Sequence, residues 1–123
     1  MPIVRADDGH LFETHGARFT SYAATTRGSS RLCAWRLDLP PDTEGVTHRP
    51  SKEEIVLVLE GAITFAIDGD EIELRPGDVA VIPANGELRV DTGAVGASAW
   101  VTTTCGLEAH LSDGTSFAPP WAQ

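Results

Sequence analysis

One histidine and one glutamate, six positions apart, are the residues of this chain whose types and spacing could do chemistry together. His48 and Glu54 lie in the stretch GVTHRPSKEEIVLVLEG, from Gly45 to Gly61, which ends in an apolar segment typical of a strand. A neutral imidazole and an ionised carboxylate can bind a divalent metal ion, and they can also transfer protons as a general acid and base. The stretch therefore supplies half of a metal site or a proton-transfer pair.

The elements that must position these residues are short strands. Apolar or alternating segments recur every eight to twelve residues, separated by Gly, Pro, Asp and Asn, which is the pattern of an all-β sandwich or barrel. We expect one domain over residues 1–123, because the chain has the length of a single core. The expected strands cover residues 10–15, 17–25, 30–39, 54–61, 62–68, 71–77, 78–84, 87–92, 98–106 and 107–112.

The turns between these strands are predicted from their residue types. Asp68, Gly69 and Asp70 predict a tight hairpin in which Gly69 supplies a positive φ. The run RPGD at residues 75–78 predicts a type II turn with glycine at its third position. The stretch LPPDTEG at residues 39–45 predicts a loop over one end of a barrel, because its two prolines remove two hydrogen-bond donors from any strand ladder.

Two segments of the chain together resemble the conserved motifs of the cupin superfamily, which run in outline G-x5-H-x-H-x3-E-x6-G and G-x5-P-x-G-x2-H-x3-N. The first segment has His48, Glu54 and Gly61 at matching positions, and the second is RPGDVAVIP at residues 75–83. The likeness covers residues 45–92. It implies an all-β cupin jelly-roll barrel of antiparallel strands, a small-molecule ligand and a homodimer.

In cupins, two His and one Glu of the first motif and one His of the second hold a divalent metal ion. His48 and Glu54 match two of these positions, but Pro50 stands at the second histidine. Counting without a gap from the proline of the second motif places Leu88 at the last histidine, whereas one inserted residue would place Arg89 there. We favour the ungapped count, because it puts Asn85 at the turn glycine and asparagine tolerates the left-handed conformation.

Two protein ligands are fewer than the three that an open catalytic metal site keeps, so we expect no metal cofactor. If a metal is bound, His48 and Glu54 are its ligands. A metal-dependent oxygenase or isomerase with iron, manganese, nickel or zinc is the alternative, with a ligand recruited from His10, His15 or His110.

Without a metal, His48 and Glu54 would form a carboxylate–histidine pair in which the glutamate orients the imidazole as a proton shuttle. The resulting prediction is an acid–base isomerase, cyclase or dehydratase acting on a small molecule. A second alternative is a non-catalytic binding or sensor barrel, in which Arg49 or Arg89 holds Glu54.

Five further residues are predicted to contact the ligand, and one of them is the indole on the strand at residues 30–39, for which a core or dimer contact is the alternative. Trp35 would provide a stacking wall for an aromatic or polyketide-like ligand if its face of the strand lines the cavity. The set is Tyr22, Trp35, Leu88, Trp100 and Thr102. In the tail FAPPWAQ, Phe117 and Trp121 would cap the barrel end, contact a partner subunit or form a lid.

Composition limits the partners that this chain could have. The net charge is -9 with a single lysine, which argues against nucleic acid because phosphate binding requires clustered Lys and Arg. No apolar run approaches the length of a membrane span, and the N-terminus lacks the pattern of a secretory signal, so we expect a cytoplasmic protein. Cys33 and Cys105 have no CxxC spacing, and we expect two buried, unpaired thiols.

Overall fold

The predicted hairpin at residues 68–70 forms as its residue types require. In the computed structural model, which describes residues 2–123, Asp68 and Gly69 have φ angles of 49° and 89°. They join β6 (Ile63–Ile67) to β7 (Asp70–Leu74), which pair with each other in antiparallel register. Two successive residues with positive φ are the mark of a type I′ turn, so the predicted tight hairpin is confirmed.

Two other turns fix the segment around β8 (Val79–Ile82). Before this strand, Gly77 has a φ of 93° and the Asp78 N–H donates to the Arg75 carbonyl at 2.9 Å, as the predicted type II turn requires. After this strand, Asn85 takes a φ of 65°, the left-handed conformation that the ungapped count assigned to it. Both turns are therefore confirmed.

The strands form two antiparallel sheets of six strands each. In one sheet the order is β1 (His10–Thr14), β2 (Ala17–Ala23), β3 (Leu32–Leu39), β10 (Ala97–Thr104), β5 (Glu54–Glu60) and β8. In the other the order is β12 (Ser116–Phe117), β11 (Ala109–Leu111), β4 (His48–Pro50), β9 (Leu88–Asp91), β6 and β7. The short 3-10 helices are η1 (Ala6–Asp8), η2 (Thr25–Arg27) and η3 (Pro120–Ala122).

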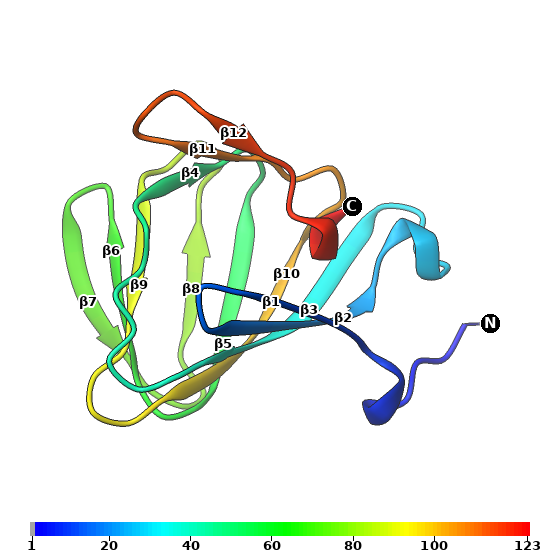
Figure 1. Ribbon diagram of the computed structural model, residues 1–123, viewed down its shortest axis with the longest axis horizontal. Helices are drawn as coiled ribbons and strands as arrows, with labels where there is room; N and C mark the ends of the chain where they lie inside the picture. Colours follow the sequence, from blue (N-terminus) through cyan, green and yellow to red (C-terminus); the bar gives the residue numbers. More distant parts are fainter. Residues whose placement is uncertain (1) are drawn as a thin grey trace.

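The two sheets face each other as the layers of a jelly roll (Figure 1). Alternate residues of β3, β5 and β10 point inward, so Trp35, Val56 and Val101 lie in one buried cluster. Phe65 and Leu88 reach this cluster from the opposite sheet. The all-β jelly-roll barrel is therefore confirmed, and the ten expected strands all form with shifts of a few residues at their ends.

Two strands of the structure were not expected from the sequence. β4 contains only three residues and includes Pro50, and β12 contains two residues. Both are too short to show a period, and proline usually argues against a strand. β4 forms because β11 and β9 pair with it from both sides.

The prediction that Cys33 and Cys105 are unpaired is wrong, because the structure joins them in a disulfide. β3 and β10 are antiparallel neighbours, and their register places Cys33 opposite Thr103, two residues before Cys105. The Cys105 N–H also donates to the Arg31 carbonyl at 2.8 Å, which brings the two Cα atoms within 5.2 Å of each other. This pairing depends on strand register, and the 72-residue separation gives no local signal of it.

Among residues 2–123, no helix has the length and apolar character needed to cross a membrane. Disulfides persist mainly in oxidising compartments, so the disulfide does not favour the cytoplasmic location expected from the sequence. That location stays a prediction.

Candidate functional site

A cavity of about 400 Å³ lies between the two sheets. Its volume falls within the range of about 300 to 1,000 Å³ that is usual for small-molecule sites. Aliphatic and aromatic side chains from both sheets line most of it, including Leu37, Phe65, Ile82 and Val101. Both residues singled out for chemistry, His48 and Glu54, also line this cavity.

Glu54 is the buried carboxyl group of the cavity. It is the first residue of β5, and the alternation of this strand turns Glu54, Val56 and Val58 inward. The residue is 6% exposed, and its side chain has neither a hydrogen bond nor an ion pair with any residue in the described range 2–123. Burial away from water disfavours the charged form and raises the pKa of Glu54 to about 7.

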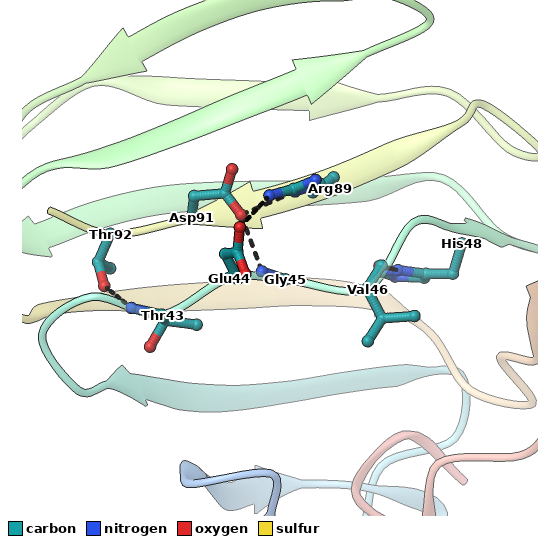
Figure 2. Close-up of polar contacts among 8 residues, drawn as sticks. All are labelled: Thr43, Glu44, Gly45, Val46, His48, Arg89, Asp91 and Thr92. Carbon is teal, nitrogen blue, oxygen red and sulfur yellow. Dashed lines mark hydrogen bonds and ion pairs between the residues drawn. The ribbon is translucent and has the colours of Figure 1, made fainter.

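His48 reaches the cavity from the opposite sheet, as the first residue of β4. Its Nδ1 lies 2.8 Å from the Val46 carbonyl oxygen (Figure 2). Because a carbonyl oxygen can only accept, this hydrogen bond requires the proton on Nδ1. The bond therefore fixes the tautomer and leaves Nε2 as the nitrogen that can accept a proton.

The structure does not form the direct contact between His48 and Glu54 that the sequence suggested. The backbone of Val46 orients the imidazole instead, a role that a residue-type pattern cannot reveal because every residue has a carbonyl. Glu54 therefore does not orient the imidazole of His48.

Neither arginine proposed to hold Glu54 does so. Arg49 donates to Glu87 at 3.1 Å and to the Asn85 carbonyl at 3.0 Å. Arg89 is bound to Asp91 at 2.9 Å and lies 3.5 Å from Glu44. The alternative of a non-catalytic binding barrel explained Glu54 as the partner of one of these arginines. The structure does not contain that ion pair.

The residues at the four cupin metal positions are brought together, but they are not a metal-binding set. His48 pairs directly with Leu88 across β4 and β9, and Pro50, Glu54 and Leu88 all line the cavity. Leu88 is 4% exposed, whereas Arg89 points away from the cavity, so the ungapped count describes the geometry correctly. Across residues 2–123 no three His, Cys, Asp or Glu side chains cluster as metal ligands, and the donor set does not fit a three-ligand centre.

None of the three other histidines joins His48 and Glu54 in a cluster of metal ligands. His15 has a φ of 50° in the turn between β1 and β2, and it lines the cavity from an exposed position. His10 is exposed on β1, and His110 makes a 2.7 Å hydrogen bond to Ser116. None of the three completes a metal site with His48 and Glu54.

Two of the five predicted ligand contacts line the cavity, and three do not. Trp35 and Leu88 are in its wall. Tyr22 donates from its hydroxyl group to the Ala6 carbonyl at 2.6 Å, and its ring lies 5.6 Å from that of Trp100. Thr102 pairs with Ile55, which is 45% exposed.

The placement of Tyr22, Trp100 and Thr102 at the ligand is therefore corrected. Strand alternation is the reason, because in β10 the face that carries Val101 is the inner one. The sequence predicted the two faces of this strand but could not indicate which one is inside.

Trp35 has one unusual feature beyond its place in the wall. Among the side-chain nitrogens and oxygens of residues 2–123 that have no accessible surface at all, its Nε1 is the only one without a hydrogen-bond partner. An unpaired buried donor is costly, typically by about 1–3 kcal/mol. Trp35 therefore lines the cavity as a residue, whereas its N–H is closed off from the open space.

Aromatic residues close one side of the cavity. The rings of Phe19 and Trp121 stack with centroids 3.8 Å apart, and Phe117 meets Trp121 edge-on at 6.0 Å. All three line the cavity, so the C-terminal tail caps the barrel as one of the sequence-based alternatives held. Phe19 and Phe65 were missed as lining residues, because an aromatic residue on a strand is more often simple core.

The loop before β4 lies at the opening of the cavity, and Figure 2 shows its polar contacts with Arg89 and Asp91 of β9. Glu44 and Val46 line the cavity and are exposed, which places them at its opening. Asp91 anchors this loop by accepting from the Gly45 N–H at 2.8 Å. A side chain at Gly45 would collide with the Val90 carbonyl oxygen, so the close approach of the loop requires glycine.

The chain resembles known proteins in sequence and in fold. The curated relative it matches is an endoribonuclease YbeY of Myxococcus xanthus, at 28% identity over 81 residues, which is 66% of this chain and 26% of the relative. The chain therefore spans about a quarter of that relative's length.

Two solved structures resemble the fold at low sequence identity. The polyketide cyclase RemF from Streptomyces resistomycificus has a TM-score of 0.78 at 20% identity, covering 87% of this chain and 81% of that one. A sugar phosphate isomerase of the cupin superfamily from Silicibacter pomeroyi has a TM-score of 0.71 at 19% identity, covering 96% and 93%. At these identities the likeness shows the fold alone.

The model of the cupin domain family matches residues 35–97, just over half of the chain. The match includes His48, Glu54, the second motif and Leu88, and it agrees with the jelly-roll topology of the two sheets. The chain belongs to the cupin domain family.

Proposed function

We propose that this cupin is a metal-independent acid–base enzyme that isomerises, cyclises or dehydrates a small molecule in the barrel cavity. The observation that carries the proposal is Glu54, a carboxyl group buried in an apolar cavity with no partner among the described residues. Because its pKa is about 7, roughly half of it is protonated near neutral pH, and it can both give and accept a proton. A purely structural carboxylate would instead be paired or hydrogen-bonded.

His48 is the second catalytic residue of the proposal. With Nδ1–H bound to the Val46 carbonyl, Nε2 is available to remove a proton from a carbon atom next to a carbonyl group. Glu54 in its acid form protonates the carbonyl oxygen, so the products of this step are an enol, an imidazolium and a carboxylate. Return of the proton at another carbon gives an isomer, and attack of the enol carbon on a second carbonyl of the same molecule gives a ring.

The function is tested with 2-tetralone, a neutral ketone whose α-protons exchange through the same enol. We expect the protein to speed their exchange with deuterium oxide, followed by proton NMR. We expect His48→Gln to slow the catalysed exchange by roughly a hundredfold or more, the usual contribution of a positioned base. His110→Gln is the matched control, because His110 lies outside the cavity.

Exchange no faster than with equal concentrations of free imidazole and acetate would overturn the proposal. Unchanged exchange in His48→Gln would remove the shuttle role. The first result would favour the non-catalytic binding or sensor barrel, and the second would assign the catalysis to a group other than His48.

We also propose that the protein is a homodimer, as expected of a small cupin. β8 is an edge strand, and its Val79 and Val81 are 51% and 59% exposed beside Ile55 of β5. An exposed apolar edge strand is a site for strand pairing with another chain. We expect a dimer in size-exclusion chromatography with light scattering, and a monomer for Val81→Asp.

Val95→Asp is the control for the dimer, because Val95 is 71% exposed in the loop before β10. A monomeric parent protein, or equal dissociation in both variants, would contradict an interface at β8.

A further inference from the structure

The cavity wall contains neither lysine nor arginine, the side chains that usually bind an anion. Among its lining residues the ionisable ones are His15, Glu44, His48 and Glu54, with neither lysine nor arginine. Carboxylates and phosphates are usually bound by Arg or Lys, or by the N-terminus of a helix. The described residues form no α-helix, so that second kind of anion site is missing from them as well.

The arginine at the mouth is already neutralised. Arg89 Nε binds Asp91 at 2.9 Å, and its Nη2 lies 3.5 Å from Glu44 (Figure 2). Asp91 also accepts from the Gly45 N–H, so moving Arg89 toward a ligand would break its ion pair with the residue that anchors this loop. Arg89 is therefore held as a structural residue of the mouth.

A cationic ligand is disfavoured by the state of Glu54. Burial keeps much of this carboxyl group in its neutral form near pH 7, and an ion pair formed there would need two charges taken out of water. The remaining polar groups of the wall match a neutral oxygen better. The protonated carboxyl group of Glu54 is a hydrogen-bond donor, and Glu54 lines the cavity.

The aromatic side of the cavity matches the apolar part of such a ligand. Trp35 lies in the sheet wall, and the stacked pair of Phe19 and Trp121 lies beside the tail. Flat rings gain about 0.5–1.5 kcal/mol from an aromatic partner beyond the burial of their area.

We infer that the cavity selects a neutral, largely apolar ring compound bearing a carbonyl oxygen, and that it rejects carboxylates, phosphate esters and ammonium compounds. The inference names the substrate class of the proposed enzyme and rests on that function for its catalytic meaning. As a statement about binding it depends only on the lining of the cavity.

The test compares four compounds with one ring system by isothermal titration calorimetry at pH 7. They are 2-naphthamide, 2-naphthoate, 2-naphthyl phosphate and 2-naphthylmethylammonium. We expect the neutral amide to bind at least tenfold more tightly than each charged compound. Equal or tighter binding of any charged compound overturns the inference, as does an amide that does not bind at 1 mM.

A cation placed at the mouth tests the cause of this selectivity. Val46 is 58% exposed, so Val46→Arg adds a positive charge without disturbing the core. We expect it to raise the affinity for 2-naphthoate about threefold or more relative to any change in the affinity for 2-naphthamide. Val95→Arg, in an exposed loop outside the cavity, is the control and changes neither affinity.

An unchanged affinity for 2-naphthoate in Val46→Arg would mean that missing positive charge is not the reason for rejection. The calorimetry separates the inference from the proposed function, because it needs no turnover. Binding of the amide without exchange of 2-tetralone would keep the ligand class and reject the enzyme. Catalysed exchange of 2-tetralone together with preferred binding of an anion would keep the proposed enzyme and reject the ligand class.

Discussion

Loss of the Cys33–Cys105 disulfide is expected to lower the free energy of unfolding by roughly 4 kcal/mol. The disulfide closes a loop of 72 residues, and a cross-link of that length removes much of the entropy of the unfolded chain. The double variant Cys33→Ala, Cys105→Ala should therefore unfold at a clearly lower urea concentration than the parent protein. Urea titration without reductant, followed by fluorescence, measures the difference.

Reductant provides the control for this experiment. Excess dithiothreitol should lower the unfolding midpoint of the parent protein toward that of the double variant and leave the variant where it was. Thiol titration of the denatured, unreduced protein should find no free thiol. Two free thiols, together with equal stability of parent and variant, would show that the disulfide does not form.

Glu54→Gln is expected to make the protein more stable at alkaline pH than the parent. The folded-state pKa of Glu54 is about 7, raised from 4.5, so the folded protein binds this proton more tightly than the unfolded chain does. Stability from this proton is fully present below pH 4.5 and is lost as the pH rises through 7, a change of roughly 3 kcal/mol. Glutamine cannot ionise, so the variant avoids this loss.

The measured quantity is the difference in unfolding free energy between Glu54→Gln and the parent, from urea titrations at pH 4.5, 6, 7 and 8.5. The difference should grow with pH in favour of the variant and level off above about pH 8. Glu53→Gln makes the same chemical change at the exposed neighbouring position and should give a curve parallel to the parent. A parallel curve for Glu54→Gln itself would show that Glu54 is not buried as a neutral acid.

The sequence by itself determined the local chemistry of the fold. Gly69, Gly77 and Asn85 were assigned positive φ from their residue types and neighbours, and all three have it. Alternation and turn spacing located ten strands, and the two motifs identified the family. These features were predictable because each depends on residues close together in the chain, or on spacings within one segment.

The motif count also gave the identity of the residues at the centre of the barrel. His48, Glu54 and Leu88 line one cavity, as expected from counting without a gap. Pairing of His48 with Leu88 confirms that their positions in the two motifs correspond to neighbouring positions in space. Their chemical roles stay predictions until the exchange experiments are done.

Only the tertiary structure decided which face of each strand is inside and which distant groups meet. A period of two residues divides β10 into two faces, but it does not show which face the opposite sheet covers. Trp100 and Thr102 were therefore predicted to contact the ligand, whereas the structure shows that Val101 lines the cavity. The register of β3 against β10 made the disulfide, and the loop before β4 brought the Val46 carbonyl to His48. The raised pKa of Glu54 likewise depends on the whole barrel. It is caused by burial, and the side chains that exclude water from Glu54 come from many parts of the sequence.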